Sequence, residues 1–230
     1  MKLSIVIPVA PGDRSWTSLQ EHLKPDASCE IILATADCAG DEDRRLYAEA
    51  QKSRWRLVSS AKGRAQQLNR GARAAIGQTL WFLHGDSKLD AESLKKVFEK
   101  TQNPLDGLYF LDLKFDRDQL WQMMVNEIGV YVRSHFLKIP FGDQGFLIDR
   151  KKFLGLGGFD ESAAFGEDHL FVWKCHHQGI AVKPLGANIQ TSSRKYEKQG
   201  WLKTTLNHLY LTGKQAKPEL LELAKNQWKV

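Results

Sequence analysis

Short apolar runs alternate along the chain with longer segments that carry an apolar stripe. Runs rich in β-branched and aromatic residues predict strands at 3–9, 30–34, 55–58, 79–83, 107–115 and 146–148. Apolar residues at helical spacing predict helices at 63–76, 90–101, 121–137 and 169–177. Strands that alternate with helices in this way indicate an α/β fold with helices on both faces of the sheet.

The length of the chain favours one large domain with a tail. A chain of 230 residues with 42% hydrophobic residues can bury a substantial core, and we place the domain at 1–200. The basic segment at 201–230 predicts a helical tail with one break at Pro218. Its apolar positions suit packing on the domain, and peripheral contact with an anionic membrane is the alternative.

Composition excludes few partners but informs the compartment. The net charge of +6 is scattered along the chain, and no segment combines a concentrated basic face with aromatic residues, so we expect no nucleic-acid binding. The cysteines, Cys29, Cys38 and Cys175, lack CxxC spacing, which argues against a disulfide framework and favours the cytoplasm. The apolar run at 3–10 is too short to span a membrane.

Polar residues follow the most apolar strand directly. The run at 79–83 leads into His84-Gly85-Asp86-Ser87. Ligands of open α/β sheets bind at the carboxyl ends of strands, so we expect a site at this position. The Asp86 carboxylate suits Mg²⁺ or Mn²⁺, which would take further oxygen ligands from phosphates and water. The alternative is that Asp86 only caps the following helix.

Four motifs in order along the chain resemble one enzyme family. They are the segments at 4–8, 63–72 and 82–87 and the triplet Gly166-Glu167-Asp168. Together they resemble glycosyltransferase family 2, whose GT-A fold is a three-layer α/β/α sandwich with a mixed central sheet. The segments at 63–72, 84–86 and 141–145 further resemble the bacterial branch associated with arsenosugar biosynthesis or radical-SAM/selenodomain proteins. The similarity spans roughly residues 3 to 205.

The resemblance implies a donor half at about 1–100 and an acceptor half at about 101–200. Pro8 matches the region that cradles the nucleobase, and Asp37 would be a base contact. Arg64 and Asn69 match the helix that faces the nucleotide, where a guanidinium suits a diphosphate; an ordinary surface arginine is the alternative. His84 would face the ribose or diphosphate as a hydrogen-bonding group rather than as a metal ligand.

The remaining implied roles concern the metal, the proton and the closure of the site. Asp86 matches the family's metal-binding carboxylate. Asp168, preceded by Glu167, matches the catalytic base that takes the proton of the acceptor hydroxyl, although both acidic residues also suit the start of a helix. Arg194 lies where the family has a basic and aromatic closure motif and would contact the diphosphate.

Two further polar segments carry alternatives. Asp143 and Gln144 in the loop at 141–145 are candidates to bind sugar hydroxyls, and a tight structural turn is the alternative. The run Cys175-His176-His177 contains metal-ligating residues, but neighbours on a helix point to different sides and no fourth ligand is evident. We do not expect a zinc site there.

We therefore expect a metal-dependent, inverting glycosyltransferase that uses a nucleotide diphosphate sugar and an unidentified acceptor hydroxyl. A nucleotidyltransferase would need a basic Gly-rich loop after the first strand, of which the segment at 9–14 is a poor version. A non-catalytic nucleotide-sugar-binding partner is the other alternative. The presence of both Asp86 and Asp168 weighs against that alternative.

Overall fold

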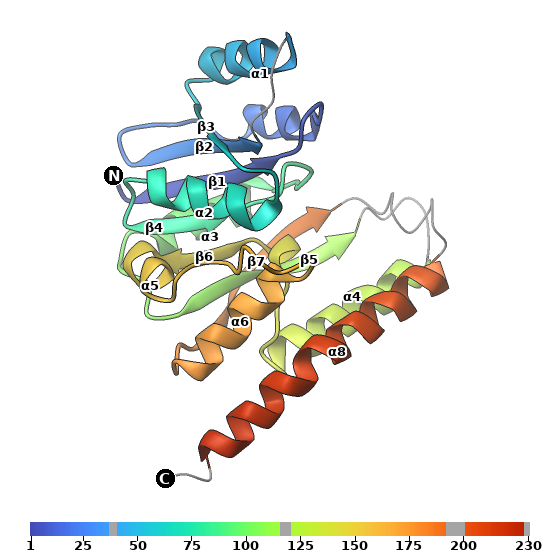
Figure 1. Cartoon of the computed structure of the whole chain (residues 1–230). Helices are drawn as coiled ribbons and strands as arrows, with labels where there is room; N and C mark the ends of the chain where they lie inside the picture. The colour runs from blue at the N-terminus through green and yellow to red at the C-terminus, as the bar shows by residue number, and fades with distance from the viewer. Residues whose placement is uncertain (37–40, 116–120, 192–200, 228–230) are drawn as a thin grey trace.

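The structure, a computed structural model, describes residues 1–36, 41–115, 121–191 and 201–227. Within these residues one sheet has the strand order β3-β2-β1-β4-β6-β5-β7 (Figure 1). The strands are β1 (Leu3–Val9), β2 (Cys29–Ala36), β3 (Arg56–Ser60), β4 (Thr79–Phe82), β5 (Leu108–Phe115), β6 (Phe146–Asp149) and β7 (Val182–Thr191). Only β6 runs antiparallel to its neighbours within this sheet. The result is a mixed α/β sheet, as the sequence predicted.

Helices cover both faces of the sheet and form three layers (Figure 1). The helical elements are η1 (Ser15–Glu21), α1 (Asp41–Lys52), α2 (Arg64–Ala74), α3 (Ala91–Lys100), α4 (Trp121–His135), η2 (Gly142–Gln144), α5 (Arg150–Gly155), α6 (Glu167–His177) and α8 (Trp201–Gln227). Residues of α2, α5 and α6 pack around Phe82 and Phe146 in one apolar cluster. Residues of η1, α3 and α4 pack around Trp81 in the other. Successive strand residues point to opposite faces, which is why neighbours such as Trp81 and Phe82 belong to different clusters.

The helix predicted at 90–101 is confirmed, and its capping residue decides one alternative. Helix α3 begins at Ala91, and the Asp90 side chain accepts a hydrogen bond from the Ser93 backbone N–H at 2.6 Å. An aspartate in this position stabilises the first turn of a helix. The cap is therefore Asp90, and the hypothesis that Asp86 is only a helix cap is wrong.

The predicted break at Pro218 is also wrong, because α8 continues through it from Trp201 to Gln227. A proline removes one backbone hydrogen bond, but here side chains on both sides of it tie α8 to α6. Gln215 hydrogen-bonds His169 at 3.0 Å and Glu219 contacts His177 at 2.8 Å. Figure 1 shows α8 as a long helix beside α6 and α4.

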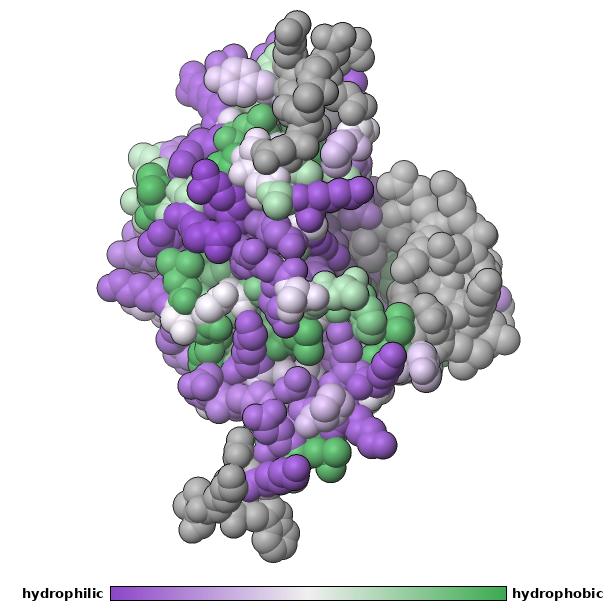
Figure 2. Space-filling view, in the orientation of Figure 1, coloured by the Kyte–Doolittle hydropathy of each residue, from purple (hydrophilic) through white to green (hydrophobic). Residues whose placement is uncertain are grey.

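The surface in the orientation of Figure 2 is mostly hydrophilic, with hydrophobic residues in small separate groups. Among the described residues, no helix is both long and apolar enough to cross a membrane.

A buried polar network ties together the amino ends of three strands. Glu30 Oε1 accepts hydrogen bonds from Ser4 Oγ at 2.6 Å and from the Ile76 N–H at 2.7 Å, and Oε2 contacts Arg56 Nη1 at 2.5 Å. Burial raises the pKa of the Glu30 carboxyl, but the Ile76, Ser4 and Arg56 donors outweigh it and leave this pKa below its ordinary value. Glu30 is therefore a satisfied, ionised group inside the fold.

Candidate active site

A cleft of about 340 Å³ opens at the carboxyl ends of β1 and β4, which are neighbours in the sheet. Its lining residues are Pro8, Ala10, Asp13, Ser15, Arg64, Gln67, His84, Gly85 and Asp86. Pro8, Arg64, His84 and Asp86, named from the sequence, come from three separate segments and meet here. The carboxyl edge of an open α/β sheet is the expected place for such a cleft.

The first turn of α2 faces this cleft with Arg64 as its first residue. The N-cap is Gly63, which has a φ of 142° and offers no side chain to the helix. A φ of 142° is a backbone conformation that residues with a side chain rarely adopt, so this turn needs glycine. An uncapped helix start beside a guanidinium suits a diphosphate, because backbone N–H groups and positive charge act on the anion together.

Arg64 connects the two sides of the site. Its Nε lies 3.1 Å from Glu167 Oε1, and its Nη2 hydrogen-bonds the His84 Nε2. Burial and the Arg64 charge lower the pKa of His84 to about 3, so the imidazole is neutral and Nε2 serves as an acceptor. Arg64 therefore joins the loop after β4 to the start of α6.

Asp168 lies in the first turn of α6 and is held by two backbone N–H groups. Its Oδ2 accepts from Gly142 at 2.6 Å and its Oδ1 accepts from His169 at 2.9 Å. Burial raises the pKa of the Asp168 carboxyl, but the Arg64 charge and the two N–H donors outweigh it and lower this pKa. The carboxylate is thus ionised at neutral pH and able to accept a proton.

The absence of a side chain at Gly142 lets its backbone N–H lie close to the Asp168 carboxylate. A Cβ on Gly142 would lie 2.9 Å from Asp168 Oδ2 and 3.0 Å from Arg64 Nη2. Any larger residue would push one of these charged groups away.

Asp143 shares this charged environment. Its Oδ1 is shielded from solvent and has no hydrogen-bond partner among the described residues. Burial raises the pKa of the Asp143 carboxyl; the Arg133 and Arg64 charges oppose the rise, and Asp168 and Asp86 add to it. A carboxylate oxygen that is shielded from solvent and has no partner is suited to a ligand, since leaving it unpaired is costly.

Gln144, in contrast, is used by the fold. It is buried, its Oε1 accepts from Ser134 Oγ at 2.8 Å and from the Phe141 N–H at 3.1 Å, and its Nε2 donates to the Leu111 carbonyl at 3.1 Å. Both ends of the amide are occupied, so Gln144 holds the turn and is not available to a sugar hydroxyl. For this residue the structural alternative is the better one.

Asn69 also differs from its expected place. Its Nδ2 donates to the Phe159 carbonyl at 2.9 Å, and its Oδ1 accepts from the Phe159 N–H at 2.9 Å. The side chain is buried against this turn and does not line the cleft. The physical reason is helix geometry, because position i+5 from Arg64 points well away from it.

Gln67 takes the place on α2 that Asn69 was expected to fill. It lies at i+3 from Arg64 and lines the cleft, where its Nε2 donates to the Val9 carbonyl at 2.6 Å and to the Ala34 carbonyl at 3.0 Å. Helical spacing from Arg64 was the signal that could have identified it.

Asp13 and Ser15 form a second part of the lining, beside Gly85, and sequence reasoning missed both of them. Asp13 Oδ1 accepts from the Ser15 N–H at 2.9 Å, a turn typical of Asp-x-Ser. A Cβ on Gly85 would lie 3.1 Å from Ser15 Oγ and 3.3 Å from Trp16 Cβ. A side chain at position 85 would therefore need Ser15 or Trp16 to shift. The expected contacts Asp37 and Arg194 lie outside the described residues.

A family comparison matches residues 13–159 with the model described as glycosyl transferase family 2, which is more than half of the chain. The chain belongs to glycosyl transferase family 2. No match was found among the curated proteins.

Comparison with solved structures shows that this family 2 chain has the GT-A fold. Residues 1–349 of S. aureus TarS in complex with UDP-GlcNAc have a TM-score of 0.61 at 17% identity, covering 84% of this chain and 58% of that one. The mannosyltransferase PcManGT from Pyrobaculum calidifontis, in complex with GDP-Man and Mn²⁺, has a TM-score of 0.63 at 16% identity, covering 82% and 56%. The chain spans less than two thirds of the length of each.

The cleft of this family 2 protein offers carboxylate ligands that suit a hard divalent cation. Asp86 presents a carboxylate to the cleft, and its charge acts on Asp143, whose Oδ1 is unsatisfied. Carboxylate oxygens are the ligands that Mg²⁺ and Mn²⁺ prefer. Among the described residues Asp86 belongs to no converging group of three ligands, so phosphate and water oxygens would complete the coordination.

Proposed function

We propose that this family 2 protein is an inverting glycosyltransferase that moves a sugar from a nucleotide diphosphate sugar to an acceptor hydroxyl. One observation carries the proposal: Arg64, Asp86 and the base candidate Asp168 converge on one charged edge of the sheet, linked through His84 and Glu167. This combination provides an anion site, a metal ligand and an ionised base within one cluster.

The donor would lie across the carboxyl ends of β1 and β4. Pro8 and the segment that contains Asp37 would contact the base, and Arg64 with the first turn of α2 would hold the diphosphate. Arg194 would add a second diphosphate contact. When bound at Asp86, Mg²⁺ or Mn²⁺ stabilises the negative charge of the leaving diphosphate.

On the acceptor side, Asp168 would take the proton of the hydroxyl as its oxygen attacks the anomeric carbon. The new carbon–oxygen bond forms on one face of the sugar while the bond to the diphosphate breaks on the other, and the diphosphate keeps the electron pair. Asp143 would bind a sugar hydroxyl through its unsatisfied oxygen. We accordingly assign residues 1–100 to the donor half and 101–200 to the acceptor half.

The donor base and the branch of the family are narrower proposals. The TarS structure holds UDP-GlcNAc and the PcManGT structure holds GDP-Man, so uridine and guanosine donors are the first to test. The motifs at 63–72 and 141–145 support membership of the branch associated with arsenosugar biosynthesis or radical-SAM/selenodomain proteins.

An exposed apolar face on α4 supports peripheral membrane contact. Met124, Ile128 and Phe136 are 66%, 63% and 73% exposed, and further exposed residues on or next to this helix are Val125, Tyr131, Val132 and Leu137. The polar side chains of Glu127 and His135 instead contact Lys114 and Asp112 of β5. We propose that this protein is cytoplasmic and that the α4 face, in place of the tail expected from the sequence, meets the inner membrane surface, where the net charge of +6 favours anionic lipid.

Flotation with anionic vesicles tests the membrane contact. The wild type should float and Ile128→Glu should not. Tyr47→Glu is the control and should float like the wild type, because Tyr47 is equally an exposed large side chain but lies on α1 and not on α4. Equal flotation of all three proteins, or none of the wild type, would remove this part of the proposal.

The transferase proposal is tested by donor turnover. We expect slow release of nucleoside diphosphate from UDP- or GDP-sugars with Mn²⁺, water acting as acceptor, and no release of pyrophosphate from nucleoside triphosphates. Pyrophosphate release would support a nucleotidyltransferase. Donor binding without any release would support a non-catalytic partner.

A further inference from the structure

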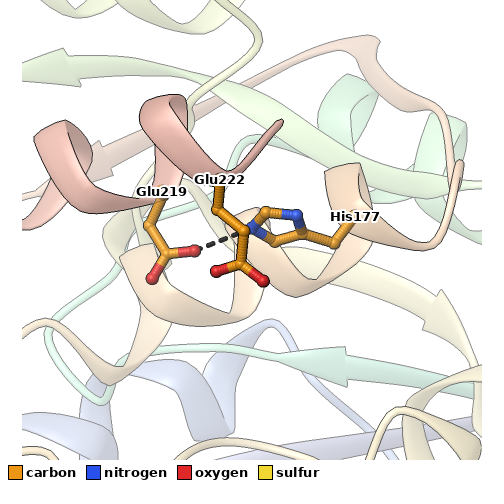
Figure 3. A group of neighbouring side chains, drawn as sticks. All are labelled: His177, Glu219 and Glu222. Atoms are coloured by element: carbon orange, nitrogen blue, oxygen red, sulfur yellow. Dashed lines mark hydrogen bonds and ion pairs between the residues drawn. The ribbon is translucent and has the colours of Figure 1, made fainter. Parts of the chain in front are cut away.

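Three potential metal ligands meet where α8 crosses the end of α6. His177 is the last residue of α6, and Glu219 and Glu222 lie one turn apart on α8. Figure 3 shows the two carboxylates and the imidazole pointing toward one another from the two helices. Among the described residues this is the group of His, Cys, Asp and Glu side chains whose ligand atoms converge in this way.

The distances fit one ion after a small adjustment. His177 Nε2 lies 2.8 Å from Glu219 Oε2, and the ligand atoms of all three residues lie within 4.8 Å of one another. Ligand atoms around a tetrahedral Zn²⁺ are roughly 3.3 Å apart, since each lies about 2.0–2.1 Å from the metal. The 2.8 Å contact is shorter than this value and no pair of ligand atoms is more than 4.8 Å apart, so a small movement of the exposed Glu222 side chain and of the two contacting groups would suffice.

The donor set selects a class of ion. One imidazole nitrogen with two carboxylates is typical of sites for Zn²⁺ and similar divalent transition-metal ions, whereas Mg²⁺ and Ca²⁺ prefer oxygen ligands alone. We propose that His177, Glu219 and Glu222 bind Zn²⁺ or a similar divalent transition-metal ion. This ion would hold α8 against α6, at a site separate from the cleft. Water would fill the open positions beside the exposed Glu222.

The neighbouring residues of the Cys-His-His run do not take part. Cys175 is buried, and His176 Nε2 contacts the Lys138 carbonyl at 2.8 Å. The three side chains diverge, as helix geometry predicts, and the partners of His177 come from α8 instead.

The site would affect the position of the whole α8 face. Gln215, Glu219 and Glu222 follow the i, i+4, i+7 spacing of one helix face. Gln215 already contacts the start of α6, since its Nε2 donates to the Phe165 carbonyl at 2.8 Å and its Oε1 accepts from His169 Nδ1 at 3.0 Å. An ion at the other end of α6 would fix α8 at two points along the helix that carries Asp168.

Calorimetric titration with ZnCl₂ in excess Mg²⁺ tests the proposal, because Mg²⁺ would occupy the proposed oxygen-ligand site at Asp86 and leave this one open. We compare the wild type with His177→Ala and Glu222→Gln, and with Asp86→Ala as the variant of the cleft. The Glu222→Gln change keeps the His177–Glu219 contact and thus the apo packing. Glu99→Gln makes the same chemical change at an exposed position of α3 and serves as the matched control.

We expect one zinc ion on the wild type and on Glu99→Gln, and binding at least about tenfold weaker on both site variants. Zinc should also raise the thermal unfolding temperature of the wild type but not that of Glu222→Gln. Equal zinc affinity in the wild type and both site variants, or zinc binding lost only in Asp86→Ala, would overturn the proposal.

Discussion

The two ends of the central sheet both gather buried charge, but they treat it differently. At the amino ends, Glu30 is surrounded by Ser4, Arg56 and the Ile76 N–H, and each of its oxygens has a partner. At the carboxyl ends, carboxylates face one another around Arg64, and Asp143 keeps an oxygen without a partner among the described residues. The first cluster is complete within the chain and the second is not.

This difference indicates that the cluster at the amino ends stabilises the fold and that the cluster at the carboxyl ends binds a ligand. A satisfied buried network contributes to folding, whereas an incompletely satisfied one costs stability unless a ligand completes it. The open cleft lies at the incomplete end, next to Asp86 and His84. Variants at the carboxyl ends should therefore change binding and catalysis, and variants at the amino ends should change stability alone.

The largest effect is expected for Asp168→Asn. Removing the proposed base should lower the rate of sugar transfer by about 10²–10⁴-fold while donor binding stays within a few-fold, since proton transfer typically contributes this much. Steady-state rates and nucleotide titrations check both parts. A variant that keeps near wild-type turnover would show that another group accepts the proton.

Arg64→Gln should weaken binding of the donor diphosphate by about 1.5–3 kcal/mol, the range of a hydrogen bond to a charged group. Arg64→Lys should restore only part of it, because an ammonium lacks the forked donor geometry of a guanidinium. Competitive titration with the nucleoside diphosphate measures the change. Unchanged affinity in both variants would move the diphosphate site elsewhere.

Glu30→Gln tests the amino ends of the strands, where we expect an effect on stability but not on donor binding. Its amide places an N–H₂ where the carboxylate accepted hydrogen bonds, and we expect a loss of about 1–3 kcal/mol in the free energy of unfolding. Urea unfolding measures it. Donor binding and turnover should remain those of the wild type, and a loss of donor binding would undo the separation between the two ends.

The stability difference between wild type and Glu30→Gln should depend on pH. The pKa of Glu30 is lower in the folded state than in the unfolded chain, so the carboxylate's contribution is complete above the unfolded value of about 4.3 and is lost as the pH falls through the folded value. Unfolding curves at neutral and acidic pH should therefore converge for the two proteins on acidification. A constant difference would assign the effect to packing.

The fold was readable from the sequence where local signals were strong. The helix expected at 90–101 became α3 with Asp90 and Thr101 as its caps, and apolar runs such as 79–83 became central strands. The break at Pro218 was wrong because contacts with α6 outweigh the local preference of proline.

The site was readable only in part. Arg64, His84 and Asp86 follow strand ends or a glycine turn, and such positions can be placed on a sheet edge from the sequence. The choice between Gln67 and Asn69 depends on the rotation of α2, and the burial of Gln144 depends on residues far away in the sequence. The contact of His177 with Glu219 joins positions 42 residues apart, which no local pattern reveals.

The central claim is that the incomplete end of the sheet is a metal-assisted donor site. Calorimetric titration of uridine and guanosine diphosphates, with and without Mn²⁺, tests it on the wild type, Asp86→Ala and Glu30→Gln. The account predicts that one nucleotide binds tightly to the wild type and to Glu30→Gln, and that this binding needs both Mn²⁺ and Asp86. Binding of neither nucleotide under any condition, or equal binding to Asp86→Ala, would contradict it.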